Sequence, residues 1–176
     1  MKKIAIAVLL SSLVAQPAVA DLYTGIKVGR VAYGYNGVTG NNQVGYGLLY
    51  GNTITKNFSV EGEFNTLGGY NTATDKVTGI AYSLSAIGFY PVKQHYSLFG
   101  KVGIVNSTLT ATAKSGSGQT GSRTIHNAGL TVGFGARYNL SKEVGIRVGV
   151  DSYSVTSTAS NTSIAHAMYI CSVLKF

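Results

Sequence analysis

The sequence predicts an all-β protein, an eight-stranded antiparallel up-and-down transmembrane β-barrel. Apolar side chains alternate with small or polar ones along most of the chain, which is the period of two that strands have. The alternating runs are about ten residues long, close to the roughly 9 to 11 residues that a tilted strand needs to cross a bilayer. The face opposite the apolar one is rich in glycine, which suits a crowded interior better than a surface in water.

The first twenty residues, MKKIAIAVLLSSLVAQPAVA, predict a cleaved secretory signal peptide. Lys2 and Lys3 precede an uncharged stretch, and Ala18-x-Ala20 forms a small-residue cleavage site before Asp21. The apolar stretch is shorter than the roughly 20 residues of a membrane-spanning helix. We therefore expect a signal peptide at residues 1–20 and one barrel domain at residues 21–176.

The expected strands follow the same alternating pattern in chain order. In LYTGIKVGRVAY, Ile26 and Val28 lie opposite Lys27 and Gly29. The run QVGYGLLYGNTI sets tyrosine and leucine against glycine, and NFSVEGEFN sets phenylalanine and valine against glutamate. The pattern continues to the last strand, so the expected strands are residues 22–33, 43–54, 57–65, 77–90, 96–106, 127–138, 143–153 and from about 163 to the end.

The connections between these runs alternate in length. TKN, PVKQH and LSK are short, whereas residues 34–42, 66–76, 107–126 and 154–162 are long and rich in Gly, Ser, Thr and Asn. Because consecutive strands are antiparallel, all short connections fall at one end of the barrel. The sequence therefore predicts one end with tight turns and one end with four loops.

The composition excludes several other classes of protein. After removal of the signal peptide, twelve basic and six acidic residues leave a net charge of +6, but the charges are scattered and form no basic run, so we expect no nucleic-acid partner. Cys171 is the single cysteine, so no internal disulfide can form. Twenty-three glycines and twelve tyrosines, with no tryptophan, favour strands over helices.

Three stretches resemble a known family: YTGIKVG, SAIGFYPVKQHYSLFGKVGI and GFGARYNLSKEVGIRVGV. They are similar to the small outer-membrane barrels typified by the transmembrane domain of outer membrane protein A. The resemblance implies a location in the outer membrane of a Gram-negative bacterium, in contact with outer-membrane lipids. It also implies that the terminal Phe176 is the assembly signal read by the barrel-assembly machinery. The family has many roles, so the resemblance specifies the fold better than the function.

Strand parity sends eight charged side chains into the barrel lumen: Lys27, Glu61, Glu63, Lys101, Arg137, Arg147, Asp151 and Lys175. Buried charges must be paired or hydrated, so we expect a luminal charge network that plugs the barrel. The resemblance implies pairing among Lys27, Glu61 or Glu63, Lys101 and Arg147, whereas Arg137 stands where the best-known member of the family has an acid. Five basic residues against three acidic ones leave a narrow, low-conductance porin-like channel as the alternative.

The sequence does not indicate an enzyme, a cofactor or a metal site. A lipid A hydrolase of this size would need a serine beside a histidine oriented by an acid. His95 falls in a turn, His126 at the edge of a loop and His166 on the apolar face, and the luminal acids point away from that face. Three separate histidines and one thiol do not make a metal cluster.

Two residues interrupt the apolar, lipid-facing side of the predicted barrel. Arg30 and His166 lie on the first and last strands, which are neighbours once the barrel closes. A cation costs about 2 to 4 kcal/mol at the centre of a bilayer and close to nothing at its interface. We therefore expect a lipopolysaccharide contact there, with snorkelling of Arg30 to water as the alternative. The loops could carry a host or phage surface ligand, although no motif identifies one.

Overall fold

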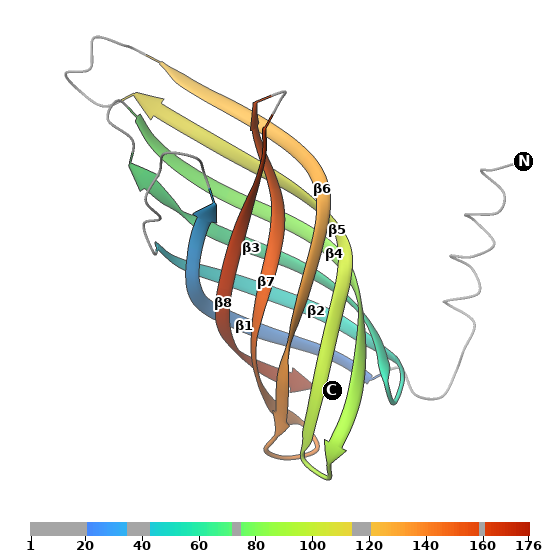
Figure 1. Ribbon diagram of the computed structural model, residues 1–176. Coiled ribbons are helices and arrows are strands. Elements are labelled where there is room, and N and C mark those ends of the chain that lie inside the picture. Colours follow the sequence, from blue (N-terminus) through green and yellow to red (C-terminus); the bar gives the residue numbers. More distant parts are fainter. Residues whose placement is uncertain (1–20, 35–42, 72–74, 114–120, 159–160) are drawn as a thin grey trace, which may run out of the picture.

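The protein forms a closed barrel of eight antiparallel strands, as the sequence predicts (Figure 1). The computed structural model describes residues 21–34, 43–71, 75–113, 121–158 and 161–176, so the predicted signal peptide lies outside the described residues. The strands are β1 (Asp21–Gly34), β2 (Gln43–Thr55), β3 (Phe58–Asn71), β4 (Asp75–Lys93), β5 (Tyr96–Ala113), β6 (Ser122–Asn139), β7 (Val144–Thr158) and β8 (Asn161–Lys175). None of the described residues lies in a helix long and apolar enough to cross a membrane.

The barrel closes between its first and last strands. β1 pairs with β8 over twelve residue pairs, from Tyr23 opposite Lys175 to Gly34 opposite Ile164. The amide N–H of Phe176 then donates to the carbonyl of Leu22. Closure satisfies the backbone groups of both outer strands, which a lipid environment requires because it offers no hydrogen bonds.

Several strands are longer than the alternating pattern indicates. β3 extends to Asn71, β4 begins at Asp75, and β5 and β6 run to Ala113 and from Ser122. The expected loops at 66–76 and 107–126 are therefore largely strand, and His126 lies within β6 rather than at a loop edge. The outward residues of these extensions include many Ser and Thr, such as Thr108, Thr110 and Thr112 of β5, so they lack the apolar outward face that identifies a strand between lipid and lumen.

The outward surface is apolar and carries aromatic rings near the end with short turns. These exposed rings belong to Phe58, Tyr90, Tyr96, Tyr138 and Phe176. Tyr96 and Tyr138 pack together with their ring centroids 4.7 Å apart. Girdles of aromatic residues at the membrane interface are typical of transmembrane barrels.

The interior is filled by two apolar clusters with charged residues between them. Toward the loop end lie Val31, Tyr33, Leu67, Val77, Ala81, Val105, Leu109, Tyr153, Val155, Ala165 and Ala167. Toward the short-turn end lie Tyr23, Leu49, Ile87, Phe99, Tyr169, Cys171 and Val173. The alternation predicts inward-facing residues at these positions, but it does not predict that so many of them are large and apolar.

The interior glycines provide the space that these large side chains occupy. Gly51 lies opposite Tyr23, and the Tyr23 ring covers it so closely that a Cβ there would overlap the ring. Gly135 and Gly149 face each other across β6 and β7, and a Cβ on Gly135 would lie 2.8 Å from Cζ of Phe99. Covering glycine with a neighbouring aromatic ring is a known way to stabilise a curved sheet.

Candidate functional site

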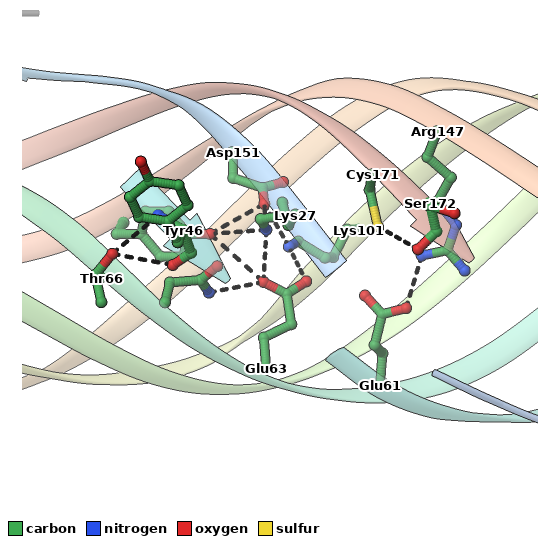
Figure 2. A network of polar contacts seen from close by, with 12 residues as sticks. Lys27, Tyr46, Glu61, Glu63, Thr66, Lys101, Arg147, Asp151, Cys171 and Ser172 are labelled. Carbon is green, nitrogen blue, oxygen red and sulfur yellow. Dashed lines mark hydrogen bonds and ion pairs between the residues drawn. The ribbon is translucent and has the colours of Figure 1, made fainter. Parts of the chain in front are cut away.

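The centre of the lumen holds a cluster of four charged side chains from four strands. Lys27 of β1 and Lys101 of β5 each contact both Glu63 of β3 and Asp151 of β7, as Figure 2 shows. The four N···O distances are 2.8 Å and 2.7 Å for Lys27, and 2.6 Å and 2.7 Å for Lys101. All four side chains are buried, and two positive charges balance two negative ones. We call these residues the central quartet.

Three polar or aromatic residues that the sequence does not single out complete the central quartet. The hydroxyl of Tyr153 donates to Asp151 Oδ2 at 3.0 Å, and Asn65 Nδ2 donates to Glu63 Oε2 at 3.0 Å. The ammonium of Lys27 lies 4.2 Å from the ring centroid of Tyr169. Asn65 and Tyr153 follow Glu63 and Asp151 at a spacing of two, so strand parity alone could have identified them.

A separate ion pair, outside the central quartet, lies nearer the short-turn end. Arg147 Nη1 donates to Glu61 Oε2 at 2.6 Å, and Figure 2 shows this pair apart from the central quartet. The guanidinium carbon of Arg147 lies 5.0 Å from the ring centroid of Tyr23 and 5.9 Å from that of Phe99. Arginine stacks favourably on aromatic faces, so these rings hold the guanidinium in the apolar cluster around it.

Arg137 and Lys175, the remaining members of the predicted network, make no ion pair within the described part of the chain. Arg137 is buried on β6, and its guanidinium carbon lies 5.3 Å from the ring centroid of Phe89. Lys175 is half-buried at the end of β8. The structure therefore joins six of the eight predicted charges into two balanced groups and leaves these two outside them.

The packing around the central quartet leaves little free space. The apolar clusters lie on either side of it along the lumen. On β7, for example, the inward residues run in order from Arg147 through Asp151 to Tyr153 and Val155. A cavity beside Lys27 and Tyr153 offers about 10 Å³. This is close to the minimum that holds one water molecule.

Arg30 and His166 both lie exposed on the outward face. Arg30 pairs with Met168 of β8, and His166 pairs with Ala32 of β1. The two side chains are therefore diagonal neighbours on the outward face of the seam, offset by two residues along the strands. Arg30 contributes to a shallow outward depression lined mainly by apolar side chains, among them Val28, Phe134, Val148, Met168 and Ile170.

Two of the histidines are not isolated, contrary to the expectation from sequence. His166 Nδ1 lies 2.9 Å from Ser152 Oγ, and His126 Nδ1 lies 3.0 Å from Thr108 Oγ1. Each pair joins neighbouring strands on the outward face, where cross-strand partners meet. No carboxylate is bonded to either histidine in the described residues, and these residues contain no group of three or more His, Cys, Asp or Glu side chains placed to hold a metal ion.

Phe176, the predicted assembly signal, lies at the short-turn end with its side chain 72% exposed. Its backbone is held to β1 through Leu22. The ring is therefore presented outward beside the seam where the barrel closes.

Comparison with known proteins finds similarity to outer-membrane β-barrel proteins. The model of the family described as the outer membrane protein beta-barrel domain matches residues 5–170. No curated protein matches the chain in a sequence search. The solved structures that resemble the chain do so in fold, at low sequence identity.

Three of these structures share almost the whole barrel. The attachment invasion locus protein Ail of Yersinia pestis is 15% identical, with a TM-score of 0.65, over 90% of this chain and 100% of that chain. Neisserial surface protein A is 10% identical, with a TM-score of 0.74, over 88% and 97%. OprG of Pseudomonas aeruginosa is 11% identical, with a TM-score of 0.59, over 90% and 96%. At these identities the similarity shows the fold alone.

Proposed function

Because the chain belongs to the family of outer membrane protein beta-barrel domains, we propose that it is an integral membrane barrel plugged by luminal charged side chains, with a structural or surface-interaction role. It is located in the outer membrane of a Gram-negative bacterium. In such barrels the short turns face the periplasm and the long loops face the exterior, which gives the two ends of this barrel their orientation.

The observation that carries the plug is the balanced central quartet between two apolar clusters. An ion crossing the lumen would have to part Lys27 and Lys101 from Glu63 and Asp151. Removing one partner of a buried ion pair costs about 3 to 5 kcal/mol, because the other charge stays buried without compensation. The large inward side chains on both sides keep water from replacing these contacts.

Conductance of the purified, refolded protein in planar lipid bilayers tests the plug against the channel. We expect no steady single-channel current from the wild-type barrel. A stable current step of uniform size, seen in every insertion, would instead establish the narrow porin-like channel. The control is the refolded double variant Arg147→Glu with Glu61→Arg, because its lumen keeps the net charge and the residue composition of the wild type.

The surface-interaction role is supported by the long strands at the exterior end. β4, β5 and β6 extend there, and exposed Lys76 and Arg123 lie on these extensions. One structure of Ail holds the heparin analogue sucrose octasulfate, which shows that this barrel fold can present a ligand site. We propose that these extensions and their loops bind a host or phage surface ligand. Unchanged attachment to host cells and unchanged phage adsorption after deletion of the protein would contradict this role.

We further propose that Arg30 and His166 contact a phosphate of lipopolysaccharide. Arg30 is nine residues from Asp21, and His166 is nine residues from Lys175, so both lie well away from the periplasmic end. A guanidinium there can pair with a lipid A phosphate, and the apolar depression beside it can receive an acyl chain.

Arg30→Ala should lower the thermal stability more in membranes that contain lipopolysaccharide than in phospholipid alone. The reason is that only the first membrane supplies the phosphate partner. The midpoint of heat-induced unfolding in the two kinds of vesicle measures this difference. Lys56→Ala is the matched control, because it removes the same charge from an exposed turn at the periplasmic end. Equal losses for Arg30→Ala in both membranes would leave snorkelling as the explanation.

A further inference from the structure

The periplasmic end of the lumen has an excess of positive charge that the protein does not neutralise. Arg137 of β6 and Arg147 of β7 are directly opposite each other in the strand register. Their guanidinium carbons lie 5.3 Å and 5.5 Å from the centroid of the same ring, that of Phe89. Like charges directly opposite each other on neighbouring strands are destabilising. Glu61 forms its ion pair with Arg147, so no carboxylate among the described residues pairs with Arg137.

Both arginines also keep buried donors without a partner. Nε and Nη2 of Arg137, and Nε and Nη2 of Arg147, have no hydrogen-bond partner in the described part of the protein. Arg147 is only 2% exposed and Arg137 only 9% exposed. A buried charged donor that stays unpaired is costly, so four such atoms in one place indicate a site that is completed by something else.

Lys175 adds a third cation to the same end of the lumen. It lies on β8 opposite Tyr23 of β1 and within electrostatic reach of both guanidinium groups. The exposed carboxylate of Asp21 also lies within its reach. Three cations then face two carboxylates, and one of these carboxylates lies outside the lumen in solvent.

We propose that this end of the lumen binds a small oxyanion, of the phosphate or sulfate kind, between Arg137 and Arg147, with Lys175 at its mouth. A tetrahedral oxyanion has several acceptor oxygens, and a guanidinium donates two parallel hydrogen bonds to such an anion. One anion can therefore satisfy donors from both arginines and neutralise their repulsion. The ion enters from the periplasm as a free ion, because the barrel wall separates these inward donors from the lipid headgroups.

The test compares thermal unfolding in chloride and in phosphate at equal ionic strength, in a zwitterionic detergent. Phosphate at ten times its dissociation constant should raise the unfolding midpoint of the wild type by about 3 to 6 °C. Arg137→Gln should abolish this gain while still folding, because Arg137 makes no ion pair in the described structure. Arg123→Gln is the matched control on the same strand: it loses the same charge from the exposed exterior end and should keep the gain.

Calorimetric titration with phosphate gives an independent measurement. We expect one site per barrel in the wild type and none in Arg137→Gln. Arg137→Lys, which keeps the charge but lacks the planar pair of donors, should bind more weakly than the wild type.

Three results would overturn the proposal. An equal gain in Arg137→Gln would mean that phosphate acts by general exclusion from the protein surface. A rise of the unfolding midpoint in chloride equal to that in phosphate would mean that ions only screen the repulsion between the arginines. The unfolding midpoint could also rise in micelles doped with phosphatidylglycerol and stay unchanged in free phosphate. That result would place the phosphate on a lipid headgroup and reject the luminal site.

Discussion

Glu63→Gln should lower the free energy of unfolding by about 3 to 5 kcal/mol, the usual cost of breaking a buried ion pair. Glu63 accepts from both Lys27 and Lys101, at 2.8 Å and 2.6 Å, so its loss leaves two ammonium groups sharing the single carboxylate of Asp151. Urea-induced unfolding in detergent micelles, followed by circular dichroism, measures the change.

The control for Glu63→Gln is Glu143→Gln, which makes the same chemical change in an exposed periplasmic turn. It should alter the free energy by no more than about 0.5 kcal/mol. The positive charge left in the lumen by Glu63→Gln should also produce a small current that prefers anions. If Glu63→Gln matches the wild type in both stability and conductance, the central quartet is not a plug.

Deletion of Phe176, or its replacement by Asp, should remove most of the protein from the outer membrane. Phe176 presents an exposed ring beside the closing seam, and the resemblance to the family ties this terminal residue to recognition by the barrel-assembly machinery. Aspartate adds a charge on the lipid-facing side, which is costly although less so near the interface. The amount of heat-modifiable, folded protein in isolated outer membranes measures the effect.

Phe58→Ala and Phe176→Ala form a matched pair for this prediction. Both remove one outward phenylalanine ring from the same end of the barrel, where Phe58 is 38% exposed and Phe176 is 72% exposed. We expect only Phe176→Ala to lower the level in the membrane severely. Comparable levels for the two variants would show that the ring acts through lipid contact and not as an assembly signal.

Much of the barrel could be predicted from the sequence because lipid and lumen impose opposite demands on alternate residues. Between Leu22 and Ala32 this alternation identifies both the strand and its faces, and the structure has the same faces. Beyond the membrane, at the exterior end of the barrel, no lipid contacts the outward face, so the outward residues need not be apolar. In the part of β5 beyond Asn106, the outward residues are Thr108, Thr110 and Thr112 in place of apolar ones, so the apolar outward face that identifies a membrane-spanning strand is missing there, although Leu109 is buried in the lumen.

The pairing of the luminal charges could be predicted only in part. Parity places Lys27 and Asp151 inside. Which cation meets which acid depends on the position of each side chain along the barrel axis, and the strand register sets these positions. The contact between Ser152 and His166 depends on register in the same way. A single sequence gives the period of each strand but leaves the offset between neighbouring strands open.

The pairing of β1 with β8 determines when this protein can finish folding. Tyr23 and Lys175 are 152 positions apart in the chain, and they meet in the register that closes the barrel. Contacts between residues so distant in sequence carry a large loop-closure entropy and form slowly. Until the last strand arrives, β1 and β7 each keep an edge of unpaired backbone groups, which cannot be left in lipid. We therefore expect arrival of the final strand to limit the closure of the barrel, because a chain that lacks β8 leaves two strand edges that lipid cannot satisfy.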